Sequence, residues 1–295
     1  MRITQSMLSN NMLRNLSGSY SKMDTYMNQL STGKKINRPS DDPVIAMKGI
    51  NYRSQVTEVE QFQRNTNEVH NWMDNSDAAL DKAVQGMQKL RELAVQASND
   101  TYDQEERKNI MQEAEQLKEH LVDIGNTKVN GKYIFNGTNT DEAPFDVDGT
   151  PNYSVKPVYI EVANGTKLQA NVNPEDVFSG DPASGDDLFV NIQGLIDDLG
   201  NNNQEGIEAS IETIDANIDN IINARADLGN RMNRLELVEN RLSEQKIIAT
   251  ETMANNEDVD YEEAITNLIT QESVHRAALS AGSRIIQPSL LDFLR

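Results

Sequence analysis

The sequence predicts a mainly α-helical protein: an elongated antiparallel helical rod with coiled-coil terminal helices and a small β-rich inserted domain. Apolar residues recur at alternating steps of three and four before residue 125 and again after residue 204, which is the spacing of heptad helices. Residues 131–200 hold 8 of the 16 glycines and 5 of the 8 prolines. Only 37% of the residues are hydrophobic and 5% aromatic, which favours seams along helices over one thick core.

The first predicted helix ends before Gly33 and carries a two-position heptad seam. The seam consists of Leu13, Leu16, Tyr20, Met23, Met27 and Leu30. The spacing fits equally well an amphipathic helix packed on the core of its own domain. Methionine and tyrosine are adaptable apolar residues, however, and the rest of the segment is rich in Ser, Asn and Gln. Such a helix is weak in isolation, so we expect it to need a partner.

A second helix is predicted to start at Pro43, with Asp42 as its N-cap. Its seam runs for four heptads and Asn99-Asp100 ends the helix. The seam residues are Val69, Met73, Ser76, Leu80, Ala83, Met87, Leu90, Ala94 and Ala97. The third helix is predicted to start with a capping box over 101–104 and to close at Gly125.

The composition changes near residue 131, and alternating stretches predict short strands at 132–136, 155–162 and 167–172. Helix returns near residue 186 and breaks at 200–203. A 4, 3 pattern from Ile207 to Leu242 then predicts one helix over about 204–253, with a length of roughly 75 Å. A last helix is expected over 261–286, with Asp260 as N-cap and Pro288 ending or kinking it.

This order is nearly palindromic, so the halves before and after the insert are expected to pair antiparallel, with the two chain ends together. We predict a terminal assembly region (1–42 and 258–295), a long-helix domain (43–135 and 186–257) and a β-rich acidic outer insert (136–185). The last helix supplies a weaker seam opposite the first, formed by Ile265, Leu268, Leu279 and Ile286.

The charge distribution limits the kinds of molecule that the chain can bind. The formal net charge is −20, and residues 136–220 alone carry −15. This excess argues against a nucleic acid or an anionic membrane surface as the main partner. The chain has no cysteine, no apolar signal-type leader and no run long enough to span a bilayer. These rules predict a cytoplasmic protein, but they do not detect export routes that need no such signal.

Candidate catalytic motifs are absent from the sequence or incomplete. The spacing of Glu272 and His275 matches one half of a helical di-metal site, but a second copy is missing. Five residues separate Gly125 from Gly131-Lys132, where a phosphate-binding loop needs four, and Tyr133 replaces the required hydroxyl residue. We therefore expect no enzyme activity, no metal and no cofactor.

The segment Leu30–Pro43 (LSTGKKINRPSDDP) resembles the signature of the flagellin superfamily. In that family a heptad helix is followed by a Leu-Ser-(Ser/Thr)-Gly-(Lys/Arg)-x-(Ile/Val)-Asn turn and an Asp-Asp helix start. The matching turn residues here are Gly33, Asn37, Asp41, Asp42 and Pro43. Asn130–Thr138 (NGKYIFNGT) is a second match. The resemblance covers about 1–145 and 186–295, whereas 146–185 shows none.

Within the superfamily, the Pro-Ser-Asp-Asp-Pro form resembles subunits of the hook–filament junction more than filament flagellins, which usually have Ala-Ala after the paired aspartates. The resemblance implies a secreted structural subunit that is exported through the flagellar type III channel and self-assembles outside the cell. Its terminal helices would be disordered in the monomer. The implied partners are copies of itself, a second hook-associated protein on the hook side, flagellin on the filament side and an export chaperone on the C-terminal helix.

The sequence is also compatible with two other hypotheses about function. A filament flagellin, or a minor flagellin variant, is the nearest alternative. A cytoplasmic helical enzyme or metal-binding bundle is the alternative from another class.

Overall fold

The computed structural model describes residues 5–99, 103–179 and 187–286, and it divides into two compact units. The terminal unit comprises Met1–Glu58 and Gln245–Arg295, and the central unit comprises Val59–Glu244. Two long helices, α2 (Pro43–Ala97) and α6 (Gln204–Glu257), contribute to both units. The mainly helical architecture with a small β region confirms the predicted fold class.

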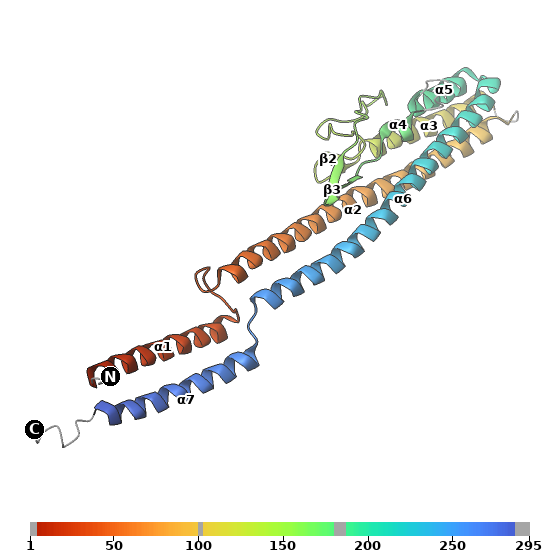
Figure 1. Ribbon diagram of the computed structural model, residues 1–295. Helices are drawn as coiled ribbons and strands as arrows, with labels where there is room; N and C mark the ends of the chain where they lie inside the picture. The colour runs from red at the N-terminus through yellow and green to blue at the C-terminus, as the bar shows by residue number, and fades with distance from the viewer. Residues whose placement is uncertain (1–4, 100–102, 180–186, 287–295) are drawn as a thin grey trace, which may run out of the picture. The chain divides into compact units, whose positions relative to one another are not determined.

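In the terminal unit, α1 (Gln5–Thr32) lies beside α7 (Tyr261–Ile286), as Figure 1 shows. The two helices are antiparallel: residues near the end of α1 contact the start of α7, whereas Met12 packs against Gly282. The predicted bounds 261–286 are confirmed for α7. The predicted helix end at Pro288 lies outside the described residues.

In the central unit, residues 59–97 of α2 run antiparallel to residues 204–244 of α6. Arg91 pairs with Asp215 near one end of this segment, and the guanidinium of Arg225 bridges Asp77 and Asp81 further along, with both shortest N–O distances at 2.6 Å. The numbers rise on one helix as they fall on the other, so the predicted antiparallel pairing is present here. The two carboxylates raise the pKa of the Arg225 guanidinium above its usual value.

The core of the central unit is built from the predicted heptad seams. All nine predicted seam residues of α2, from Val69 to Ala97, are buried. Their main counterparts on α6 are Ile207, Ile214, Ile218, Ile221, Leu228, Leu235 and Leu242, which are also buried. Helix α6 continues without a break from Gln204 to Glu257, which confirms the predicted single helix and carries its end four residues beyond the predicted residue 253.

Two further helices, α3 (Gln104–Gly125) and α5 (Leu188–Asn201), pack against each other in the central unit. The structure corrects the predicted start of α3. Its N-cap is Asp103, whose side chain accepts from the N–H groups of Glu105 and Glu106, and Glu106 completes the capping box. The predicted cap Thr101 lies outside the described residues, and Gln104 is the first helical residue rather than the third.

The end of α3 also differs from the prediction in its physical cause. Gly125 is the last helical residue and not a left-handed cap. A Cβ at this position would lie 2.7 Å from Cδ2 of Phe145. Gly125 is therefore needed for the close approach of an aromatic ring.

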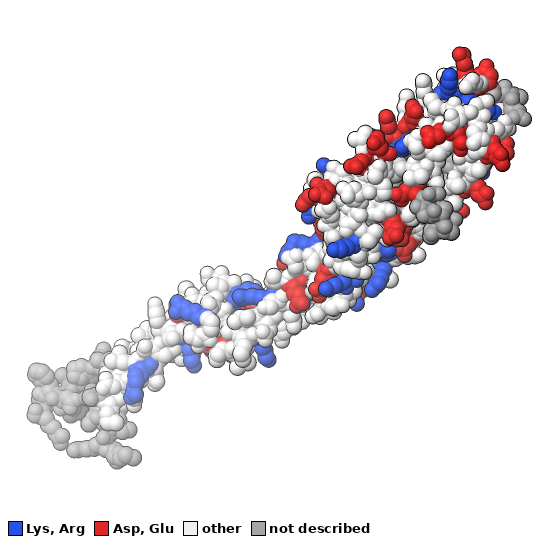
Figure 2. Space-filling view, turned by 90° about the horizontal axis from the view of Figure 1, so that it is seen from above, with Lys and Arg blue, Asp and Glu red and all other residues white. Residues whose placement is uncertain are grey.

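The β region consists of two antiparallel hairpins: β1 (Lys128–Val129) with β2 (Lys132–Tyr133), and β3 (Tyr159–Ala163) with β4 (Thr166–Gln169). The predicted strands are present but shorter than expected. Beside them lie the short helix α4 (Pro174–Phe178) and a cluster of rings that the sequence patterns did not predict. The rings belong to Phe135, Phe145, Tyr153, Phe178 and Phe189. Figure 2 shows acidic side chains gathered on the surface of the central unit.

Candidate assembly surface

A connection between two distant parts of the chain fixes the turn between α1 and α2. Gly33 has φ of 71°, the left-handed region that favours glycine. The N–H of Val259 donates to O of Gly33 at 3.0 Å, and the N–H of Lys35 donates to O of Glu257 at 2.7 Å. These two backbone bonds tie the turn to the segment between α6 and α7.

The side chains of the paired aspartates accept hydrogen bonds from backbone N–H groups of the turn and of the start of α2. Oδ2 of Asp41 accepts from the N–H groups of Asn37 and Arg38 at 3.2 and 2.9 Å. Oδ1 of Asp42 accepts from the N–H of Val44 at 2.8 Å and starts α2 ahead of Pro43. The predicted N-cap is confirmed. Gly33 supplies the left-handed residue of the turn, and Asp41, Asp42 and Pro43 shape the turn and start α2, whereas Asn37 contributes its backbone N–H.

A buried acid, which the sequence patterns did not single out, lies at the centre of this connection. Glu257 is only 4% exposed. Its Oε2 lies 2.7 Å from Nη2 of Arg53 and 3.5 Å from Nζ of Lys34. The hydrogen bond from Lys34 to Asp258, at 2.6 Å, is the main cause that raises the pKa of the Lys34 ammonium.

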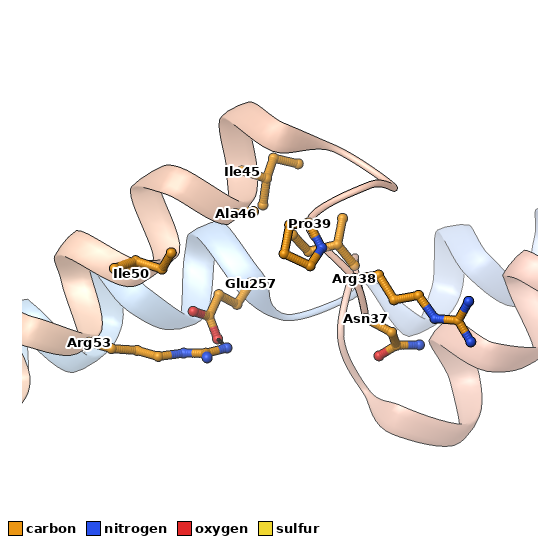
Figure 3. A pocket seen from close by; sticks show the side chains of 9 residues that line it. Asn37, Arg38, Pro39, Ile45, Ala46, Ile50, Arg53 and Glu257 are labelled. Atoms are coloured by element: carbon orange, nitrogen blue, oxygen red, sulfur yellow. Dashed lines mark hydrogen bonds and ion pairs between the residues drawn. The ribbon is translucent and has the colours of Figure 1, made fainter.

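Behind the turn lies a small cavity of about 120 Å³, the turn pocket (Figure 3). Its walls are mainly apolar and include Ile36, Pro39, Ile45 and Ile50. In Figure 3 the Arg53 side chain reaches toward Glu257, whereas the Arg38 guanidinium points away from the turn.

A larger hollow of about 470 Å³, the turn groove, lies where the end of α1, the turn and the start of α7 meet. Thr25, Tyr26 and Gln29 line it from α1, and Glu263, Ala264 and Asn267 line it from α7. The turn and its neighbours add Lys35, Ile36, Asp41, Asp42, Ile45, Val259 and Asp260.

The predicted seam of α1 divides into two halves. Leu16, Met23 and Leu30 are half-buried on the side of α1 that faces α7. Their seam partners are exposed: Leu13 by 59%, Tyr20 by 64% and Met27 by 58%. Each exposed residue precedes a half-buried one by three positions. One half of the seam thus packs within the chain, and the other half is left without cover.

The seam of α7 divides in the same way. Leu268 is half-buried, while Ile265 and Leu279 are about half exposed, and Ile269 is exposed as well. The side chain of the fourth predicted residue, Ile286, lies outside those that the structure describes. Polar and small residues complete the contact with α1: Nε2 of Gln271 donates to Oγ of the buried Ser19 at 2.7 Å.

The exposed stripes of the two helices lie on the same side of the pair. On α7, as on α1, an exposed residue precedes an interface residue by three positions: Ile265 precedes Leu268, and Leu279 precedes the buried Gly282. Both stripes are therefore displaced from the interface in the same rotational sense. Because the helices are antiparallel, this shared sense leads to one side. We call this surface the apolar flank: Leu13, Tyr20, Met27, Ile265, Ile269 and Leu279.

Sequence reasoning missed a further exposed apolar stripe at the start of α2, formed by Val44, Met47 and Ile50. Their spacing of three residues is a signal that could have predicted the stripe. The prediction for this segment concerned only the start of the helix. Across the described parts of the chain, no group of three or more His, Asp or Glu residues is arranged to hold a metal. Nor is any helix there long and apolar enough to cross a membrane.

Comparison with known protein families identifies the two helical regions. Residues 3–140 match the bacterial flagellin N-terminal helical region, and residues 211–294 match the bacterial flagellin C-terminal helical region. Together the matches take in well over half of the chain. The protein belongs to the flagellin family. The predicted family is thereby confirmed, and it is a family of structural flagellar proteins.

Curated relatives from this family align with nearly the whole chain. Flagellar hook-associated protein 3 of Escherichia coli is 26% identical over 95% of this chain and 96% of its own length. Flagellin of Bacillus subtilis is 28% identical over 92% of this chain and 94% of its own. A structure of a putative flagellar hook-associated protein from Vibrio parahaemolyticus has a TM-score of 0.69 and 21% identity, and the match covers 74% of this chain and 100% of that one. The last likeness shows the flagellin-like fold.

Proposed function

We propose that this flagellin-family chain is the structural subunit of the hook–filament junction, where it self-assembles and connects the hook side to the flagellin filament. The observation that carries the proposal is the apolar flank. Six large apolar side chains on two paired helices lie uncovered on one side. Monomeric proteins rarely leave contiguous apolar surface of this kind exposed, and such patches mark sites of protein association.

Assembly supplies a driving force that the isolated chain lacks. Complete burial of one large apolar side chain contributes about 1.5–3 kcal/mol. Six such residues, each already partly covered, offer on the order of 5–10 kcal/mol before the cost of ordering and docking is subtracted. This gain favours association and is of the same order as the cost of docking.

The terminal region is proposed to be ordered only on assembly. The α1–α7 contact rests on half-buried residues and on small or polar ones such as Ser19 and Gly282. A contact of this kind offsets little of the conformational entropy lost by two helices of 28 and 26 residues. We therefore propose that α1 and α7 open readily in the monomer, within an assembly region of 1–42 and 258–295. The long-helix domain and the outer insert keep their predicted bounds in this proposal.

The junction assignment within the family is supported by three features. The Pro39–Pro43 form of the turn and the Asn130–Thr138 segment resemble junction subunits, and the relative named hook-associated protein 3 aligns over almost its full length. The partners that follow are copies of this chain, a second hook-associated protein, flagellin and an export chaperone on the C-terminal helix. The proposed location is extracellular, in the flagellum, and the proposed role is structural and requires no catalysis.

Filament flagellin is the second candidate, because the Bacillus subtilis flagellin aligns over a similar share of the chain. Deletion of the gene in its parent bacterium separates the two. A junction subunit predicts a strain that makes hooks, is non-motile and sheds intact flagellin into the medium. A filament flagellin predicts missing or shortened filaments without shed flagellin of another kind. Normal filaments and motility would contradict both assignments.

A further inference from the structure

Identical subunits can associate in two ways, and each way requires a different set of surfaces. An isologous contact joins the same patch on both copies and stops at a dimer. A heterologous contact joins two different patches and continues into a ring or an open helix. A chain that continues therefore needs a second surface, separate from the apolar flank and shaped to receive it.

The turn groove is such a surface, and it lies on the opposite side of the α1–α7 pair. Met27 stands midway between Thr25 and Gln29, which line the groove, and residues two apart on a helix point to opposite sides. On α7, Ile265 stands in the same way between Glu263 and Asn267. Both helices thus present an apolar side chain on one flank and the groove on the other, at the same height along the pair.

Three of the four carboxylates at the groove, all but that of Glu263, already accept hydrogen bonds from backbone N–H groups. Asp41 accepts two turn N–H groups, and Asp42 and Asp260 cap the starts of α2 and α7. Their presence therefore does not call for a cationic ligand. The part of the groove without a structural explanation is its apolar lining, which consists of Tyr26, Ile36, Ile45, Val259 and Ala264.

We propose that the turn groove of one copy receives Met27 and Ile265 from the apolar flank of a second copy. The groove volume of about 470 Å³ is large enough to admit side chains from a neighbouring copy. Because the two surfaces lie at the same height, copies arranged side by side meet flank to groove with little shift along the helices. Each copy then docks its apolar flank in the groove of one neighbour and accepts the flank of another neighbour in its own groove. The same contact therefore repeats from copy to copy. This inference rests on the proposed assembly function and names the surface used.

The chain has no cysteine, so introduced thiols report contacts cleanly. In the parent bacterium, the native copy is replaced by Met27→Cys, by Asn267→Cys, by both together, or by Met27→Cys with Ser273→Cys. Ser273 is exposed on α7 outside the groove and serves as the matched control. Flagella are isolated, treated with an oxidant or a short bismaleimide, and blotted for the chain.

The double variant M27C/N267C should give a ladder of dimers, trimers and higher species, whereas each single variant and the Ser273 control should stay monomeric. Cross-linked dimers of Met27→Cys alone would overturn the proposal in favour of an isologous contact. A conjugate of the chain with flagellin, in place of a ladder, would overturn the choice of a second copy. Chain present in the flagella without any cross-link would overturn the groove contact alone. Absence of the unsubstituted chain from flagella isolated in the same way would overturn the proposed function as well.

Discussion

Nη2 of Arg53 on α2 lies 2.7 Å from Oε2 of Glu257 in the last turn of α6, and the carboxylate of Glu257 is buried. This contact joins two segments more than 200 residues apart in the sequence. Lys34 approaches the same oxygen from the turn, so one carboxylate links α2, α6 and the segment that follows α1. Removing a buried charge partner loosens every group that faces it.

Glu257→Gln is expected to weaken this connection by about 1 kcal/mol, a modest value because the Arg53 side chain is largely exposed. Amide exchange in residues 253–257 should then rise about fivefold. Glu251→Gln, an exposed position on the same helix, is the control and should leave exchange unchanged. Equal effects from both variants would show that helix charge, not this contact, governs the region.

Two glycines of the central unit should respond in opposite directions to alanine. At Gly229 on α6 a Cβ would meet nothing within 4 Å, so Gly229→Ala is expected to stabilise by up to about 1 kcal/mol through helix propensity. At Gly125 a Cβ would lie 2.7 Å from the ring of Phe145, so Gly125→Ala is expected to destabilise by about 1–3 kcal/mol. Urea unfolding of both variants measures the difference. Stabilisation by Gly125→Ala would refute the ring contact.

Alkaline pH should weaken the central unit through Tyr153. Burial, with smaller contributions from Asp187 and Glu175, raises the pKa of the Tyr153 phenol from 10.0 to about 12. The folded state therefore favours the neutral phenol, and this stability is present below pH ~10 and lost as the pH rises toward 12. The loss should be about 1 kcal/mol, less than the full shift because the ring is only half-buried.

The check on Tyr153 is a comparison with Tyr153→Phe. Urea unfolding at pH 8 and pH 11 should show a smaller loss of free energy in the variant than in the parent chain. The difference isolates this phenol from the lysines, which titrate in the same range. Identical losses in the two proteins would rule out a contribution from Tyr153.

Helices α1 and α7 are expected to exchange their amide hydrogens rapidly in the monomer and slowly in assembled flagella, because half of each seam is uncovered in the single chain. Residues 204–244 of α6, with their buried seam, serve as the protected internal reference. Hydrogen exchange read by mass spectrometry compares the two states. Strong protection of both terminal helices in the monomer would contradict the proposal that these helices become ordered only on assembly.

Much of the fold follows from periodicity, because a heptad pattern and a cap residue are local signals. Asp42 and Asp260 mark helix starts by their own side-chain bonds, and the long run of seam residues on α6 predicts one long helix. The division of the α1 seam could not be predicted. Leu13 and Leu16 look alike to a periodic pattern, and only the position of α7 decides which of them is covered.

Other features depend on contacts between distant segments and left no pattern to detect. Glu257 is one acid among 47 acidic residues until its neighbours Arg53 and Lys34 are placed around it. The ring cluster draws Phe135, Phe145 and Phe178 from separate loops and helices. The turn groove is likewise assembled from four segments, none of which is unusual alone.

Charge placed on the apolar flank tests its role in assembly most directly. A deletion strain is complemented with a chain that carries Leu13→Asp, Tyr20→Asp and Met27→Asp together, and intact flagellin in the medium is measured. Ser21→Asp, an exposed change on the face of α1 that points away from α7, is the control and should restore motility. The flank variant is expected to be exported but to shed flagellin as the deletion strain does. Normal filaments and motility with the flank variant would contradict it.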